Sequence, residues 1–274
     1  YKSSRNRDFS RESYGLTDKG LAYEENKKHS LLKQKIKVKN YLEELYVRQA
    51  EVPYIEADDL IAGYVKNREE NDIIYIFSAD KDFYSLLDKN VNVIRPSDMK
   101  IINIENFNSI FGFYYENSIL IKCFEGDDSD CVEGIKGIAR ETLINLFPDL
   151  VYKKMTIEDL VQISKEKLET NKKSKKLKVI SECENKFNLN KKLMDLNEFP
   201  ILTQEAVDAI NDVSYSMIID PNDTKDRSIE TAMKLFIRDG FHKFIFNEDY
   251  RLFFEPFYRI SIKEIEYSKK IMLN

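Results

Sequence analysis

Three short acidic segments are the residues of this sequence best suited to chemistry. They are Glu56-Ala57-Asp58-Asp59, Ser78-Ala79-Asp80-Lys81-Asp82 and Gly126-Asp127-Asp128-Ser129-Asp130. Each has an ordinary explanation alone, because acidic side chains stabilise the first turn of a helix, cap turns and are common in loops. Carboxylates that converge, however, repel one another unless hard cations neutralise them. Carboxylate oxygens are the ligands that Mg²⁺ prefers, and two such ions can promote phosphodiester hydrolysis.

The elements expected around these segments bring at least one of them to the edge of a sheet. Apolar spacing predicts a helix over 56–69, a buried strand over 73–77, a short helix over 82–87 and a second strand over 91–94. Asp80 and Asp82 directly follow the first strand. Ligands of open α/β sheets gather at the carboxyl ends of the strands. The order of elements therefore predicts an α/β core with a parallel sheet.

The rest of the chain is expected to be mainly helical. A lysine-rich helix is predicted from about 27 to 48, with Pro53 ending it. Further helices are predicted near 116–124, 141–147, 156–169, 175–195, 203–211 and 227–239. The aromatic residues of 253–258 favour a core role over a partner site. The lysines of 172–178 fit either duplex phosphates or a solvated helix face.

Composition restricts the class of protein. With 274 residues, 42% of them hydrophobic, the chain is long and apolar enough to fold into a globular core. No apolar run is long enough to span a membrane. Three cysteines without a CxxC pair and two histidines favour neither disulfides nor zinc, which fits a reducing, cytoplasmic setting. The net charge of −5 argues against a nucleic-acid binder, but the basic residues are clustered in 2–11, 27–39 and 172–178.

The acidic segments, with two further segments, resemble the motifs of a known family. Residues 55–62 resemble its EADD motif, 78–83 its S-x-D-x-D motif and 126–130 its G-D-x-S-D motif. Residues 132–139 are similar to the glycine-rich turn of its helix–three-turn–helix, and 1–5 to its YKxxR motif. The family is that of the 5′-nucleases, which includes flap endonucleases, the 5′-nuclease domains of bacterial polymerases and phage RNase H enzymes. The five motifs stand in the family's order and cover residues 1 to about 147.

The resemblance implies a fold and domains. The expected fold is a PIN-like (Rossmann-like) nuclease core over 1–112, lacking its first strand and including an arch or bridge region at about 10–50. A helix–three-turn–helix region over 113–200 and a helical carboxy-terminal region over 201–274 follow. The lysines of 27–39 fit either the arch that meets a single strand or a solvated helix face.

The resemblance also implies roles for individual residues. It implies that Glu56, Asp58 and Asp80 bind one metal ion and that Asp82, Asp127 and Asp130 bind a second. Asp59 and Asp128 have supporting roles at most. The catalytic residues it implies are Lys2, Arg5 and Asp80, and the nucleic-acid-binding residues are Lys2, Arg5, Gly134, Lys136 and Gly137. The implied ions are two Mg²⁺, with Mn²⁺ as a substitute, and K⁺ at the helix–three-turn–helix.

The sequence departs from the family pattern at several places. Two further family aspartates lie before the YKxxR motif and have no counterpart here. Because the chain begins with Tyr1 in a charged stretch, we expect a fragment or a processed product, with apolar surface left uncovered by the absent strand. Ala139 and Glu141 replace the usual glycine and lysine, which weakens the expectation of phosphate or K⁺ binding. Cys131 stands where asparagine is usual.

The function implied by the resemblance is a metal-dependent 5′→3′ exonuclease or flap endonuclease. Its substrates would be 5′-ended or flapped DNA and RNA–DNA hybrids. Its role would be the removal of RNA primers during replication of a phage genome in a bacterial cytoplasm. Expected partners are nucleic acid and single-strand-binding or other replication proteins. The enzyme is expected to be a monomer and not to associate with a membrane. The alternative is a catalytically incomplete nucleic-acid-binding remnant. Asp80-Lys81-Asp82-Phe83 could also belong to a phosphatase, but the threonine expected after such an Asp-x-Asp pair is absent.

Overall fold

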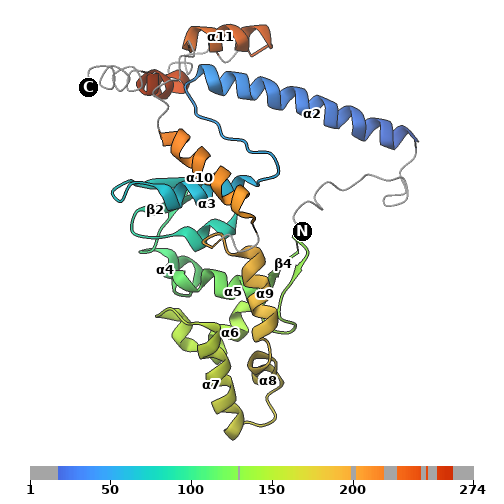
Figure 1. The fold of residues 1–274 in the computed structure, drawn as a ribbon, viewed down its shortest axis with the longest axis vertical. Coiled ribbons are helices and arrows are strands. Elements are labelled where there is room, and N and C mark those ends of the chain that lie inside the picture. Colours follow the sequence, from blue (N-terminus) through green and yellow to red (C-terminus); the bar gives the residue numbers. More distant parts are fainter. Residues whose placement is uncertain are drawn as a thin grey trace. The chain divides into compact units, whose positions relative to one another are not determined.

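The computed structural model describes residues 18–128, 130–198, 202–218, 227–241, 245 and 252–261. The predictions for Lys2 and Arg5 lie outside these residues. The chain divides into two compact units, Val52–Tyr215 and Tyr1–Glu51 with Ser216–Asn274 (Figure 1). The first contains all three acidic segments. None of the helices described is long and apolar enough to cross a membrane.

The larger unit contains a three-stranded sheet in the order β1-β2-β3. β1 (Ile74–Phe77) pairs in parallel with β2 (Val91–Arg95), as predicted, and β2 pairs antiparallel with β3 (Lys100–Ile102), which the sequence pattern did not predict. Ile74 lies opposite Val91, and Val93 opposite Ile102. Val91, Val93 and Ile102 are fully buried. The sheet therefore has one well-packed face.

The opposite face of the sheet is open. Ile73, Tyr75 and Phe77 are 65%, 53% and 61% exposed, and Ile101 on β3 is also exposed. Alternate side chains of a strand point to opposite faces, so these residues share a face. β1 is also an edge strand among the described residues. Sheets with parallel strands are normally covered on both faces, whereas this face is exposed among the described residues. That an absent first strand leaves apolar surface uncovered stays a prediction.

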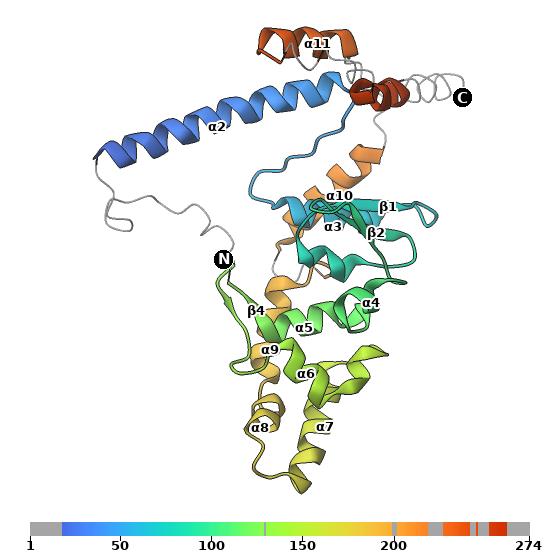
Figure 2. The ribbon, with the colours of Figure 1, turned by 180° about the vertical axis from the view of Figure 1, so that it is seen from behind.

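Helices and short strands complete this unit (Figures 1 and 2). The sequence reasons are local: Thr156 and Asp159 form a capping box that starts α7, and Gly112 ends α4 in the left-handed region. The elements are α3 (Ala57–Asn67), η2 (Lys81–Leu86), α4 (Phe107–Phe111), η3 (Tyr115–Asn117), α5 (Ser118–Glu125), β4 (Gly126–Asp127), β5 (Val132–Glu133), α6 (Arg140–Leu146), η4 (Pro148–Val151), α7 (Ile157–Thr170), α8 (Lys175–Ser181), α9 (Glu184–Met194) and α10 (Gln204–Ile218).

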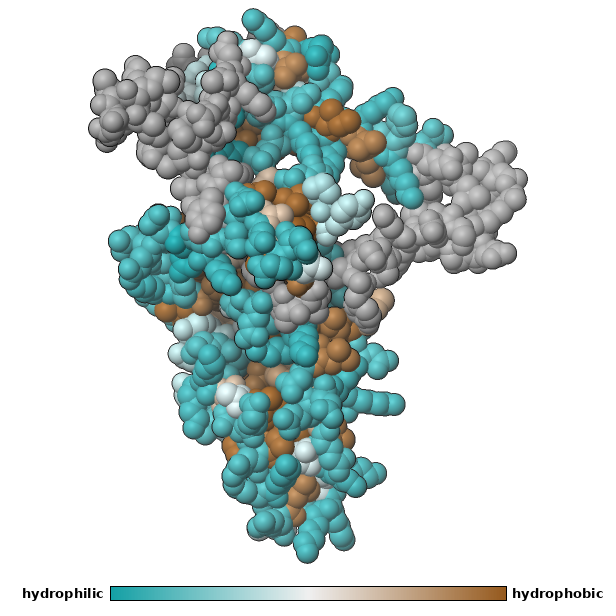
Figure 3. Space-filling view, viewed as in Figure 1, coloured by the Kyte–Doolittle hydropathy of each residue, from teal (hydrophilic) through white to brown (hydrophobic). Residues whose placement is uncertain are grey.

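One long predicted helix is in fact two. The helix expected over 175–195 breaks at Glu182 and Cys183, between α8 and α9. Leu177 and Ile180 on α8 and Phe187 on α9 are all buried in the same core. On the face shown in Figure 3, hydrophilic residues cover much of the surface, and hydrophobic residues appear in patches between them.

The second unit has a small core of its own. It contains α2 (Asp18–Glu44), α11 (Ile229–Arg238) and a helix over 252–261. Leu45, Ile229, Ala232 and Phe254 form its buried core, so the aromatic tail does pack as core. The helix expected over 27–48 begins earlier and ends at Glu44, well before Pro53.

Among the side chains of α2 that the structure describes, those from residue 26 onward, the buried ones lie near its carboxyl-terminal end. Tyr41 is buried against Phe236, whereas Leu31, Leu32 and Ile36 are exposed. Helical spacing of apolar residues thus predicted the helix correctly but not which of its turns are buried, because burial depends on what packs against it.

Candidate functional site

Three carboxylates converge beside the carboxyl end of β1. Asp82 lies at the start of η2, directly after β1, whereas Asp127 and Asp130 come from the β4 segment that follows α5. One oxygen from each lies within 4.8 Å of the others, and all three residues are half-buried. These are the residues to which the family resemblance assigns one metal ion.

Local hydrogen bonds fix the loop that presents Asp82. The Ser78 amide donates to the Ile94 carbonyl at 3.1 Å, which continues the β1–β2 ladder by one residue. The Asp80 amide donates to Ser78 Oγ, and the Asp80 carboxylate accepts from the Asp82 amide, both at 3.0 Å. Asp80 therefore caps η2. Its carboxylate holds the Asp82 backbone in place, so this part of the loop is preorganised.

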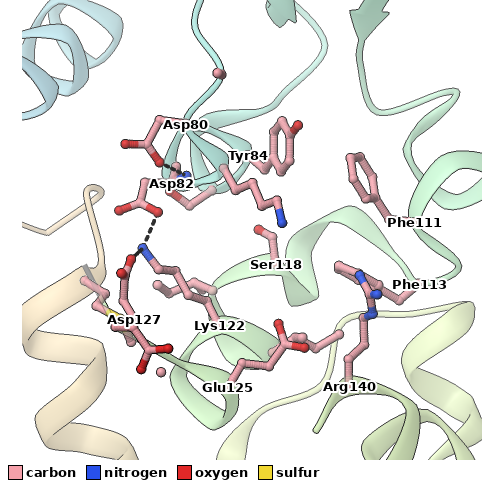
Figure 4. Close-up of a pocket in the computed structure, with 18 residues that line it drawn as sticks. Asp80, Asp82, Tyr84, Phe111, Phe113, Ser118, Lys122, Glu125, Asp127 and Arg140 are labelled. Atoms are coloured by element: carbon pink, nitrogen blue, oxygen red, sulfur yellow. Dashed lines mark hydrogen bonds and ion pairs between the residues drawn. The ribbon is translucent and has the colours of Figure 1, made fainter. Parts of the chain in front are cut away.

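Lys122 of α5 lies between two of these carboxylates (Figure 4). It forms an ion pair with Asp82 and another with Asp127, the latter at 3.1 Å. The side chains of Lys122, Asp82 and Asp127 are only 17%, 12% and 20% exposed. The sequence interpretation missed Lys122, although a lysine one turn before an acidic segment on a predicted helix was a usable signal.

Burial and ion pairing have opposite effects on the pKa values of Asp82 and Lys122. Burial raises the pKa of Asp82 to about 6, although its hydrogen bond and charge interaction with Lys122 act to lower it. Burial acts to lower the pKa of Lys122, but Asp82 and Asp127 outweigh it and raise that pKa. At neutral pH both partners are thus charged. A cation at this point neutralises the converging carboxylates.

A second acidic group lies at the start of α3. Glu56, Asp58 and Asp59 each offer an oxygen within 4.8 Å of the others, and Asp59 is buried. Asp58 and Asp59 occupy the first helical turn, where the helix dipole favours acidic residues. The sequence interpretation grouped Glu56 and Asp58 with Asp80. Among the described residues, Asp80 belongs to neither group of three, and Asp59, which it gave at most a supporting role, takes that place.

The glycines of the proposed duplex-binding turn play different structural roles. A Cβ on Gly134 would lie 2.2 Å from the carbonyl oxygen of Glu125, and one on Gly126 would lie 2.2 Å from the Gly134 nitrogen. Close packing of two chain segments therefore requires both glycines. Gly137 has φ +82° with open space around it, and neighbouring Lys136 is exposed. Of the two predicted glycines, Gly137 is the one whose backbone is accessible to a phosphate.

A pocket of about 440 Å³ adjoins the Asp82 carboxylate. The sequence interpretation identified its acidic lining but not the other residues of its wall, which come from η2, α4, α5 and the start of α6 (Figure 4). These include Tyr84, Phe111, Phe113, Ser118 and Arg140. Nothing in their spacing signals a shared site, because they lie on separate elements.

Comparison with known proteins relates this chain to a family. Residues 1–112 match the 5′-3′ exonuclease N-terminal resolvase-like domain. A 5′-3′ exonuclease of Mycoplasmopsis pulmonis is 40% identical over 92 residues, which are 33% of this chain and 31% of that protein. One of Mycoplasma pneumoniae is 35% identical over 115 residues, 40% of each. The chain is thus similar in its first 112 residues to 5′-3′ exonucleases. It spans less than half the length of these two relatives.

Solved structures agree with this family in fold. Phage T5 5′-exonuclease with divalent zinc ions bound has a TM-score of 0.60 and 20% identity, covering 80% of this chain and 77% of that one. A phage T5 flap endonuclease in a pseudo-enzyme–product complex with DNA and metal ions has a TM-score of 0.60 and 18% identity, covering 79% and 76%. The fold of the chain is thus the PIN-like α/β fold with a helical carboxy-terminal region, as predicted.

Proposed function

We propose that the chain is a metal-dependent 5′→3′ exonuclease and flap endonuclease that hydrolyses phosphodiester bonds in 5′-ended or flapped DNA and RNA–DNA hybrids. Removal of RNA primers during DNA replication is its proposed role, and a phage source remains a prediction. The observation that carries the proposal is the convergence of Asp82, Asp127 and Asp130 from two distant segments.

The donor set suits Mg²⁺ or Mn²⁺. All three candidate ligands are carboxylates, whose oxygens are the donors that hard divalent cations prefer, and the Lys122 ammonium already pairs with two of them. Asp82, Asp127 and Asp130 would hold one ion, and Glu56, Asp58 and Asp59 offer oxygens for a second; Asp80 remains the ligand proposed from the family motif. Divalent ions supply an activated water and neutralise charge on the phosphate.

The protein's own residues prepare the site for that chemistry. Asp80 fixes the Asp82 backbone through its cap, so the carboxylate does not need to reorganise when a phosphate arrives. Lys122 offers a positive charge at the same place, which offsets part of the repulsion between a phosphate and the carboxylates. The accessible backbone at Gly137 and exposed Lys136 suit contacts with duplex phosphates. Lys2 and Arg5 keep the catalytic and nucleic-acid-binding roles proposed from the family motif.

The alternative function, a nucleic-acid-binding remnant, is favoured by one observation. The apolar face carrying Ile73, Tyr75 and Phe77 is uncovered among the described residues, so part of the family's core is not present in them. A remnant of this kind would bind duplex DNA without cutting it.

Cleavage assays with Mg²⁺ test the two functions. We expect the chain to cut a 5′-flap DNA and an RNA–DNA hybrid, with activity abolished by chelation and reduced by at least about 100-fold in Asp82→Asn. Asp149→Asn is the matched control, because Asp149 is an exposed aspartate in a surface ion pair with Lys153. Equal cleavage by Asp82→Asn would contradict the carboxylate assignment. Binding without cleavage, in both Mg²⁺ and Mn²⁺, would favour the remnant.

A further inference from the structure

The pocket beside Asp82 extends away from the carboxylates to an aromatic end. Tyr84, Phe111 and Phe113 line it there, with Ser118 and Arg140 beside them (Figure 4). The Tyr84 and Phe111 ring centroids are 5.0 Å apart, and Tyr84 also contacts Phe107 edge-on at 5.6 Å. Because Tyr84 and Phe113 are buried and Phe111 is half-buried, this wall is held rigidly by the core.

A buried hydroxyl on the same wall has no partner within the described structure. Ser118 Oγ is inaccessible to water and makes no hydrogen bond among the described residues, although Ser118 lines the pocket. Buried polar atoms are nearly always hydrogen-bonded. A ligand with a polar edge in this cavity would give the Ser118 hydroxyl a hydrogen-bond partner.

The charges differ at the two ends of the pocket. Asp80, Asp82 and Asp127 lie at one end, where a phosphate requires divalent ions to bind. At the other end Arg140 is held only by a long, exposed ion pair with Glu141 at 3.4 Å. An arginine beside aromatic rings suits a planar, polar-edged group, because the guanidinium also stacks on π systems.

We propose that the aromatic end of the pocket binds one nucleobase of the nucleic acid, namely that of a nucleotide next to the phosphate held at the carboxylate end. This inference rests on the proposed function and deepens it. The pocket volume of about 440 Å³ falls within the usual range of small-ligand sites. The ring of Phe111 and the guanidinium of Arg140 contact the base, and Ser118 donates to or accepts from its polar edge. The base is unstacked from its neighbours in order to enter.

An abasic-site scan of DNA binding tests this inference without requiring cleavage. Affinity is measured, with Ca²⁺ replacing Mg²⁺, for 5′-flap DNAs that each lack one base around the cleavage site. We expect one position to weaken binding to the unmodified protein by about tenfold, the scale of one base–aromatic stacking contact. The same lesion should weaken binding to Phe111→Leu by less than about twofold, because that variant keeps the apolar volume but not the ring.

A matched control and a second variant keep the test decisive. Tyr152→Leu removes an exposed aromatic side chain outside the pocket and should retain the full tenfold effect. Arg140→Gln should reduce it as Phe111→Leu does. If intact DNA binds but no single abasic position matters, or if Phe111→Leu leaves the effect unchanged, the base subsite is wrong, while flap cleavage can still stand. If flap DNA is neither bound nor cut, the proposed function and the subsite both fail.

Discussion

Replacing Lys122 should make the stability of the larger unit depend on divalent ions. In the structure Lys122 is the cation between Asp82 and Asp127, and all three side chains are at most 20% exposed. Lys122→Met keeps most of the apolar stem but removes the charge. The variant leaves Asp82, Asp127 and Asp130, with oxygens within 4.8 Å of one another, without this cation.

The expected loss follows from the burial of the pair. Removing one partner of a buried ion pair costs about 3–5 kcal/mol, and the residual exposure of these side chains places the loss near the lower value, about 3 kcal/mol. A divalent ion that binds the folded state at 100 times its dissociation constant returns about 2.7 kcal/mol. Most of the lost stability should therefore return when Mg²⁺ is added. The unmodified protein should gain less, because the ion competes with Lys122.

Chemical denaturation in EDTA and in Mg²⁺ measures both parts of this prediction. The matched control is Lys154→Met, since Lys154 pairs with Glu116 on the surface, where the two side chains are 62% and 33% exposed, and such pairs contribute at most about 1 kcal/mol. Equal stability of Lys122→Met and the unmodified protein in EDTA would refute the reasoning. A loss of stability that Mg²⁺ does not reverse would also refute the reasoning. The divalent ion would then not take the position that the Lys122 ammonium occupies between the carboxylates.

Three further predictions concern packing, pH and backbone conformation. Gly63→Ala should lower stability by about 1–3 kcal/mol in urea denaturation, because its Cβ would lie 2.0 Å from Ile210 Cγ2; in an Ile210→Ala background, which lacks Cγ2, Gly63→Ala should cause a smaller loss. Hydrogen bonds from Lys37 and Tyr41 hold the pKa of Asp239 well below its usual range, so its stabilising contribution is complete above about pH 4 and is lost as pH falls further. Asp239→Asn should therefore lower the melting temperature at pH 7 but much less at pH 2, and an equal effect at both would contradict this. Cys131→Asn should raise the melting temperature and increase the free energy of unfolding by up to about 1 kcal/mol. The φ angle of Cys131 is +58°, and asparagine tolerates that region better. A lower melting temperature of the variant would contradict this prediction.

The Cys131 conformation gives a physical reason for the asparagine of the family motif, but not for the cysteine that stands there in this sequence. Asparagine is usual in the family at this place, and the structure shows a left-handed residue between Asp130 and Val132. Residue type predicted neither the conformation nor its cost, since cysteine has no preference for that region. Conversely, Gly134 was predicted for phosphate contact, and packing against Glu125 is a sufficient reason for it.

The sequence by itself determined the local elements and the chemical type of the site. Helix α3, strands β1 and β2 and the position of Asp82 just after β1 follow from apolar periodicity and from turn and cap residues, which act over a few neighbouring residues. The motifs also identified the family, because their residue types and order are specific.

Only the tertiary structure decided which of these residues meet. Asp82, Asp127 and Asp130 were grouped only through the family resemblance, and the structure brings them together. Lys122 lies between two of them, and Tyr41 pairs with Asp239 far along the chain. The physical reason is that such contacts depend on how whole elements pack across long sequence separations. Each helix or strand is encoded locally, but its neighbours are chosen by the burial of a shared core.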